Sequence, residues 1–243
     1  MGEGAALTAK PHRPIRSFVL RQGRMSPAQQ RACDALYPRY GVAEQDTALD
    51  FAGLFGNPRP VVLEIGFGMG ETTAAIAASA QDTNFLGVEM HWPGVGALLR
   101  RIDAQALANL RVLRHDAVDV VQTMIAPGSL AGVHVFFPDP WPKKRHHKRR
   151  LLQAPFVRAL ARTLAASGYL HVATDWVDYA DEILATLSAE PQLANTVDAF
   201  APRPAWRPLT KFEQRGLARG HEVRDLLFRR KAGPVPEATQ RAM

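Results

Sequence analysis

The 243-residue sequence lacks the features of several protein classes. Its only cysteine is Cys33, so a disulfide within the chain is impossible, and no group of cysteines and histidines has the spacing of zinc ligands. No apolar run approaches the roughly 20 residues that span a membrane, and no apolar stretch near residue 1 resembles a secretion signal. We therefore expect a soluble, cytoplasmic protein that holds no metal and does not span a membrane.

The sequence also has fewer acidic than basic side chains. It holds 30 lysines and arginines against 23 aspartates and glutamates, a net charge of +7, and its pI is near 10.0. Such an excess indicates an anionic partner, and by itself it leaves nucleic acids and membrane surfaces open. The composition does not decide between a monomer and a homodimer.

Composition divides the chain into three parts. Residues 1–30 have little apolar periodicity and carry five lysines and arginines against Glu3, which predicts a mobile basic arm, although an ordinary disordered terminus explains the same composition. Residues 31–232 have the apolar segments of a single domain, and residues 233–243 are predicted to form a disordered tail.

From Val61 onward, short apolar runs alternate with segments of helical length. We expect strands at 61–65, 85–90, 111–116, 133–137 and 168–174, and helices at 71–80, 96–107, 118–125, 151–164 and 177–187. This alternation predicts an α/β fold with a doubly wound, mostly parallel sheet that is covered on both faces. Residues 196–200 and 222–230 are candidates for late edge strands.

The first strand is followed by a glycine-rich turn in the sequence "LEIGFGMGETT". Gly66, Gly68 and Gly70 can turn sharply and let a ligand approach the backbone. A dinucleotide fingerprint would require glycine at position 71, where the chain has Glu71. Glu64 would repel a pyrophosphate and attract a cation. The pattern therefore favours S-adenosyl-L-methionine, which carries an ammonium and a sulfonium but no phosphate.

Two further acids close the next two strands. Glu89 ends "FLGVE", and its separation from Gly66 in the sequence is close to that at which an acid accepts hydrogen bonds from ribose hydroxyls. Asp116 ends "RVLRHD", where it could accept a hydrogen bond from an adenine amino group. One such acid alone would more often be a solvated residue or a helix cap. Three acids at successive strand ends favour a donor site.

The fourth strand ends in "PDPWPKKRHHKRR", residues 138–150. Pro138 and Pro140 restrict the backbone on either side of Asp139. Trp141 could stack on a base or pack over the sheet edge. A lone basic run is most often a solvated loop, but this one begins at the carboxyl end of a strand, where open α/β sheets bind ligands. It therefore favours a track for nucleic-acid phosphates beside a fixed carboxylate.

Two later segments allow two interpretations each. Asp175 follows a strand and precedes a helix, where an N-cap is the simpler role. Thr210 and Glu213 in "LTKFEQRG" have the spacing of a capping box, and a capped helix start is also a suitable wall for a guanine pocket. The scattered histidines receive no chemical role.

Four segments together resemble the bacterial tRNA (guanine-N7-)-methyltransferases. These are "LEIGFGMGETT", "FFPDPWPKKRHHKRR", "ATDWVDYADEIL" and "LTKFEQRG", in that family's order, and the resemblance covers about residues 16–231. It implies a class I S-adenosylmethionine-dependent methyltransferase fold, which is Rossmann-like. It also implies S-adenosyl-L-methionine as cofactor and tRNA as partner, with N7 of guanosine 46 in the variable loop as the methyl acceptor.

The resemblance also implies roles for individual residues. Glu64, Glu89 and Asp116 would contact the donor, beside the glycine turn, and Asp139 would be the catalytic residue. The substrate would be bound by Lys143, Asp175, Thr210, Lys211, Phe212 and Glu213. The RNA would be bound by Arg145, His146, His147, Lys148, Arg149 and Arg150.

Three other classes remain as alternatives. A nicotinamide-dependent dehydrogenase would share the fold, but the absent third glycine and Glu64 disfavour it. A non-catalytic RNA-binding module would explain the basic run but not the acids at the strand ends. A methyltransferase that acts on an adenine amino group would carry a sequence nearer Asp-Pro-Pro-Tyr than the "PDPW" found here.

Overall fold

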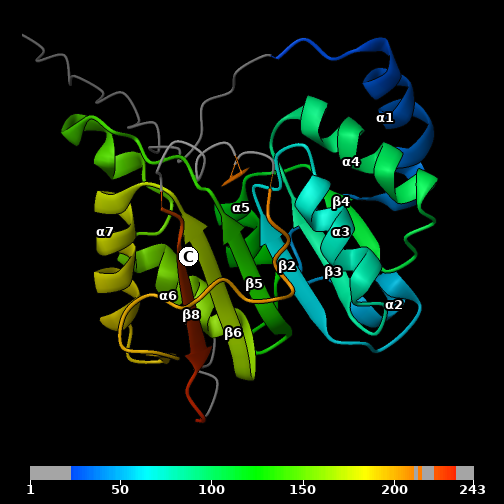
Figure 1. Cartoon of the computed structure of the whole chain (residues 1–243). Coiled ribbons are helices and arrows are strands. Elements are labelled where there is room, and N and C mark those ends of the chain that lie inside the picture. The colour runs from blue at the N-terminus through cyan, green and yellow to red at the C-terminus, as the bar shows by residue number, and fades with distance from the viewer. Residues whose placement is uncertain (1–22, 211–212, 215–221, 234–243) are drawn as a thin grey trace, which may run out of the picture.

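The chain folds around one mixed β-sheet (Figure 1). The computed structural model describes residues 23–210, 213–214 and 222–233, and within these ranges the sheet has eight strands in the order β1-β4-β3-β2-β5-β6-β8-β7. The strands are β1 (Gly41–Val42), β2 (Val61–Ile65), β3 (Asn84–Val88), β4 (Leu110–Leu113), β5 (Leu130–Phe136), β6 (Leu164–Thr174), β7 (Leu193–Asn195) and β8 (Arg224–Arg230). The predicted mostly parallel, doubly wound sheet is confirmed.

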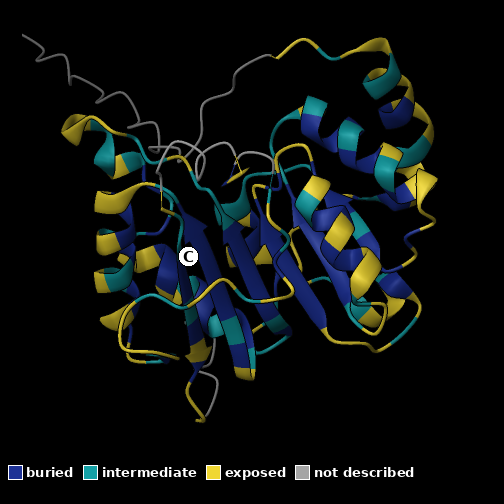
Figure 2. Ribbon diagram, viewed as in Figure 1, coloured by how far each residue is buried: buried dark blue, intermediate teal, exposed yellow. Residues whose placement is uncertain are grey.

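Helices cover both faces of this sheet. They are α1 (Pro27–Tyr40), α2 (Phe51–Phe55), α3 (Glu71–Ser79), α4 (Trp92–Ala104), α5 (Ala117–Asp119), α6 (Ala154–Thr163) and α7 (Val177–Ser188), with a π-helical turn at Val120–Met124 and a 3₁₀ turn at Lys144–Arg149. On one face α1, α3 and α4 pack in a core that includes Val62 of β2. On the other face Leu63 joins a core with residues of α6 and α7. Every residue of β2 is consequently buried, as expected for a strand covered on both sides (Figure 2).

The last strands set the edge of the sheet beside the site. β8 runs antiparallel to β6 and pairs Arg224 with Thr174. The amino end of β8 therefore lies next to the carboxyl end of β6. The candidate segment 222–230 does contain a strand, β8, but β8 lies between β6 and β7 and not at the edge of the sheet. The edge strand β7 ends before the candidate segment 196–200 begins.

Helix α1 begins within the residues assigned to the basic arm. Ser26 caps it, with Gln29 completing a capping box, and Pro27 occupies its first turn. The arm predicted for residues 1–30 therefore extends at most to residue 26. Residues 1–22 and the predicted tail from residue 234 lie outside the described ranges. Within the described part of the chain, no helix is long and apolar enough to cross a membrane.

Candidate active site

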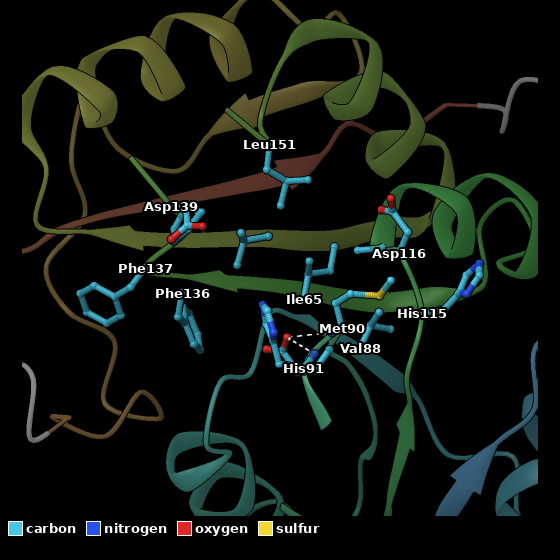
Figure 3. A pocket seen from close by; sticks show the side chains of 15 residues that line it. Ile65, Val88, Met90, His91, His115, Asp116, Phe136, Phe137, Asp139 and Leu151 are labelled. Carbon is cyan, nitrogen blue, oxygen red and sulfur yellow. Dashed lines mark hydrogen bonds between the residues drawn. The ribbon is translucent and has the colours of Figure 1, made fainter. Parts of the chain in front are cut away.

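A pocket opens at the carboxyl ends of the central parallel strands (Figure 3). Its walls come from the end of β2, the chain after β3, the chain after β4 and the segment that leaves β5, with Leu151 closing one side. Figure 3 shows Asp116 and Asp139 on opposite sides of this pocket. Of the residues predicted from sequence, it brings together Gly66, Glu89, Asp116 and Asp139.

The glycine turn has the backbone that its sequence predicts. Gly66, Gly68 and Gly70 all have positive φ angles, of 73°, 55° and 70°, a conformation that side chains disfavour. A Cβ atom on Gly70 would also lie 2.7 Å from the side chain of Leu98 in α4. Substitution of Gly70 would therefore strain the turn and push α4 away from it.

Glu89 holds the glycine turn in place. Its Oε2 accepts a hydrogen bond from the backbone N–H of Gly68 at 3.0 Å, and its Oε1 accepts from the N–H groups of Met90 and His91 at 2.7 and 3.0 Å. A carboxylate has about four acceptor sites, so these bonds leave one on Oε2. That remaining site can accept one further hydrogen bond from a hydroxyl or amino group.

Glu64 lies in β2 beneath the turn and is buried. The hydroxyl of Thr73 in α3 donates to its Oε1 at 2.9 Å, and among the described residues Oε2 has no hydrogen-bond partner. Burial raises the pKa of this carboxyl to about 7, although the Thr73 bond opposes the shift. The buried Oε2 can therefore accept a hydrogen bond from a cationic or hydroxylic group.

Asp116 combines the two roles that the sequence allowed. Its Oδ1 accepts from the N–H of Val118 at 3.0 Å, which caps α5, and its side chain also lines the pocket. Helix capping holds the carboxylate in a fixed orientation without burying it.

The loop that carries Asp139 has an unusual backbone. Phe137 and Trp141 lie on either side of the Pro-Asp-Pro segment, and both have positive φ angles, of 53° and 46°. Each such conformation costs a non-glycine residue on the order of 1 kcal/mol or more. The N–H of Phe137 donates to the carbonyl of Ala173 in β6 at 2.7 Å, which ties the loop to the sheet. Asp139 itself is exposed at the pocket rim.

Arg150 differs from the other members of the predicted RNA-binding run. Its side chain is only 1% exposed, and its guanidinium pairs with Asp178 at 2.9 Å and with Glu182, both in α7. A guanidinium that is buried and held by two carboxylates is occupied within the fold, which argues against the RNA-binding role predicted for Arg150. The residues from Arg145 to Arg149 are exposed or half-buried and remain available.

Trp141, which precedes the basic run, is in contact with two side chains of that run. The guanidinium carbon of Arg149 lies 4.8 Å from the ring centroid of Trp141, and the ring of His146 meets the same indole edge-on. Lys143 is exposed. Asp175 follows β6 and is half-buried, but the N-cap of α7 is Trp176, so the simpler role considered for Asp175 is not realised.

Thr210 and Glu213 form the predicted capping box. The N–H of Thr210 donates to Oε2 of Glu213, and the N–H of Glu213 donates to Oγ1 of Thr210, both at 3.0 Å. The Glu213 carboxylate also accepts two bonds of 2.7 Å from Arg207, a residue that sequence analysis missed because nothing marks it among the other arginines. The predicted residues Lys211 and Phe212 lie outside the described ranges.

Two buried histidines lie beneath the site. His134 of β5 bonds the hydroxyl of Tyr169 at 2.9 Å, and burial lowers its pKa to about 3. His171 of β6 bonds Asp225 at 2.7 Å. Neither lines the pocket. In the described part of the chain, no group of three or more histidine, cysteine or acidic side chains could hold a metal ion.

Comparison with known proteins identifies the family. Residues 58–226 match a family model described as "Putative methyltransferase". The tRNA (guanine-N(7)-)-methyltransferase of Nitrosospira multiformis is 59% identical over 92% of this chain and 97% of its own, and that of Chromobacterium violaceum is 56% identical over 90% and 97%. The chain belongs to the tRNA (guanine-N(7)-)-methyltransferase family. Its cofactor is therefore S-adenosyl-L-methionine.

Solved structures agree on the fold. The antibiotic-resistance methyltransferase Kmr superposes with a TM-score of 0.54 at 17% identity, covering 79% of this chain and 96% of its own. The 16S rRNA methyltransferase KamB gives 0.52 at 16% identity, covering 76% and 95%. At this identity the likeness shows the class I methyltransferase architecture alone.

Proposed function

We propose that the chain transfers a methyl group from S-adenosyl-L-methionine to N7 of guanosine 46 in the variable loop of tRNA, forming 7-methylguanosine in the cytoplasm. Family membership supports the reaction and the class of substrate. The structural observation that carries the proposal is that Asp139 shares one pocket with Glu89 and Asp116. The acid that follows β5 therefore lines the same pocket as the two acids of the proposed donor site.

The donor-binding roles in this proposal rest on one open acceptor site of Glu89 and on side chains that line the pocket. S-adenosyl-L-methionine supplies a methyl group on a positively charged sulfur. Glu89 has one free acceptor site for a ribose hydroxyl, and Asp116 presents its carboxylate to the pocket for an adenine amino group. Gly66 lines the same wall, where its lack of a side chain lets a ligand reach the backbone.

The acceptor chemistry requires alignment rather than proton removal. N7 of guanine carries an in-plane lone pair and no proton, so methylation needs no general base. Positive charge moves to the purine ring as the bond forms, and a fixed carboxylate beside that ring lowers the energy of the transition state. Asp139 has this role in the proposal, because its loop is held at the sheet edge and its carboxylate faces the pocket.

The RNA-binding surface in this proposal is the exposed part of the basic run. Lys143 and the side chains from Arg145 to Arg149 extend from the pocket rim, directly after the catalytic loop. Phosphates bound there would place a looped-out nucleotide at Asp139. Asp175 and Thr210, at the neighbouring edge of the sheet, would contact the acceptor nucleotide.

The direct test is incubation of the protein with donor and unmodified tRNA, followed by mass spectrometry of the nucleosides. We expect 7-methylguanosine from a transcript with guanosine at position 46 and none from a matched transcript with adenosine there. 7-Methylguanosine from both transcripts would show that the methylated guanosine lies at another position in tRNA. Methylated adenine in place of 7-methylguanosine would overturn the proposed reaction.

A further inference from the structure

Arg207 joins two carboxylates that come from different parts of the chain. Its Nε and Nη2 donate to the two oxygens of Asp225 at 2.8 and 2.9 Å. Its Nη1 and Nη2 donate to the two oxygens of Glu213 at 2.7 Å. The Arg207 side chain and both partners are almost completely buried. The guanidinium thus binds all four oxygens, which is the geometry that arginine forms best and lysine cannot reproduce.

One end of this bridge is fixed to the sheet. Asp225 lies in β8 beside Ala173 of β6, and Nε2 of His171 in β6 lies 2.7 Å from its Oδ1. The backbone of Asp225 also bonds that of Ala201. The carboxylate that receives Arg207 is therefore held from several sides at the carboxyl end of β6.

The middle of the bridge lies against the pocket wall. The guanidinium carbon of Arg207 is 5.9 Å from the ring centroids of both Phe136 and Phe137, and both residues line the pocket that contains Asp139. The neighbouring Trp206 packs edge-on against Tyr169 and His171. The residues around Arg207 thus lie over β6, as the chain crosses the sheet in Figure 1.

The other end of the bridge occupies the Glu213 carboxylate. It accepts two bonds from Arg207 and one from the N–H of Thr210, and the side chain is only 1% exposed. To identify guanine, a carboxylate must accept from both N1–H and the exocyclic amino group. With about four acceptor sites in total, Glu213 does not have two left.

We propose that Arg207 is a positioning residue, and that Glu213 acts through it. Arg207 anchors Glu213, and through it Thr210, to β8 and to the wall beside Asp139. Glu213 is the attachment point of that anchor and does not read the guanine edge. This inference rests on the proposed function, in which Thr210 contacts the acceptor nucleotide.

The test compares Arg207→Lys, Glu213→Gln and their double variant, with Arg230→Met as the control. Like Arg207, Arg230 is a buried arginine. It lies in β8 at the end of the strand opposite to Asp225, where it donates to the carbonyl of Leu164. Each protein is assayed for the KM of tRNA, kcat, donor affinity by calorimetry and thermal unfolding. A second tRNA with inosine at the target position, which lacks the exocyclic amino group, measures guanine selection.

We expect Arg207→Lys and Glu213→Gln each to raise the KM of tRNA by about tenfold, the scale of one charge-assisted bond. The KM of tRNA in the double variant should not exceed the higher of the two single-variant values, because both changes remove the same link. Donor affinity and the ratio of guanosine to inosine methylation should stay at their wild-type values. Arg230→Met should lower thermal stability without raising KM.

Several results would overturn the inference. Additive effects in the double variant would show that the two residues act separately. Loss of guanosine preference in Glu213→Gln alone would show that Glu213 reads the base directly. If Arg207→Lys does not fold, a wild-type KM in Glu213→Gln rejects the anchor. Absence of 7-methylguanosine with the wild-type protein would instead reject the proposed function, so the two failures are distinct.

Discussion

The Nε atom of Arg150 donates a 2.9 Å hydrogen bond to the carbonyl oxygen of Pro140, the residue after Asp139. The same guanidinium pairs with Asp178 and Glu182 in α7. An arginine at the end of the basic run thus ties the loop that carries Asp139 to α7. Arg150 is therefore a structural member of the run, whereas Lys143 and the residues from Arg145 to Arg149 are exposed or half-buried.

Arg150→Lys should distinguish a structural role of Arg150 from a role in phosphate binding. Lysine keeps the charge but cannot bond the Pro140 carbonyl and both carboxylates together. We expect the free energy of unfolding to fall by about 1 to 3 kcal/mol and kcat to fall, while the salt dependence of tRNA binding stays at its wild-type slope. Denaturant titration, a steady-state methylation assay and filter binding at several salt concentrations measure these three quantities. A shallower salt slope would mean that Arg150 contacts phosphate after all.

Arg145→Gln and Lys148→Gln should behave in the opposite way. Both side chains are exposed, so their replacement should leave the free energy of unfolding and the donor affinity unchanged. The slope of log affinity against log salt should become shallower by roughly 0.7 to 0.9 for each tRNA phosphate that the variant no longer neutralises. An unchanged slope in the double variant would make the run a solvated surface.

Asp139→Asn should reduce catalysis without reducing binding. Removing one electrostatic contact to the transition state should slow single-turnover methylation by roughly a hundredfold at saturating tRNA and donor. The rate should not recover when the pH is raised from about 7 to 9, because N7 loses no proton. Asp198→Asn, at an exposed position outside the pocket, is the matched control. Near-normal turnover in Asp139→Asn would remove this residue from the mechanism.

Glu89→Ala should weaken donor binding by roughly 1.5 to 3 kcal/mol, the range for bonds to a charged group. The same change releases the N–H groups of Gly68, Met90 and His91 from their shared acceptor. Their hydrogen exchange should therefore accelerate even without donor. Calorimetry should show binding of S-adenosyl-L-methionine and none of NAD to the wild-type protein. Unaltered donor affinity in the variant would place the ribose elsewhere.

Glu64→Gln should change how stability depends on pH. The folded-state pKa of Glu64 is about 7, against an ordinary value of 4.5, so the folded protein holds this proton more tightly than the unfolded chain. Its stabilising contribution is fully present below about pH 4.5 and is lost as the pH rises to about 7, by an amount on the order of 3 kcal/mol. The variant lacks this loss. Denaturation at pH 5 and 8 should show its stability relative to wild type increasing with pH, and a constant difference would contradict the shifted pKa.

The sheet and the pocket could be predicted from sequence because each signal is local. The acids of the pocket directly follow apolar strands, so strand order alone brings Glu89 and Asp116 together at one edge. The first turn of α1 was missed although Ser26, Pro27 and Gln29 form a legible capping box. That signal lay in a segment whose basic composition suggested disorder.

The pairings of the charged residues could not be predicted in this way. Arg150 pairs with acids about 30 residues away, and Arg207 pairs with Asp225, 18 residues further along the chain. No periodicity marks such partners, because they depend on how β8 and α7 pack against β6. The basic run therefore predicts a phosphate-binding surface, but its sequence does not reveal that Arg150 is buried.

The antiparallel pairing of β8 with β6 also sets an order of events during synthesis. All pocket-lining residues lie between Ile65 and Leu151, whereas the acid that anchors Arg207 is in β8. At roughly 5 to 20 residues per second, a ribosome takes several seconds to pass from Leu151 to Asp225. A growing chain thus completes the pocket residues before it can fix Arg207 and Glu213. The anchor forms only after the residues of β8 have been made.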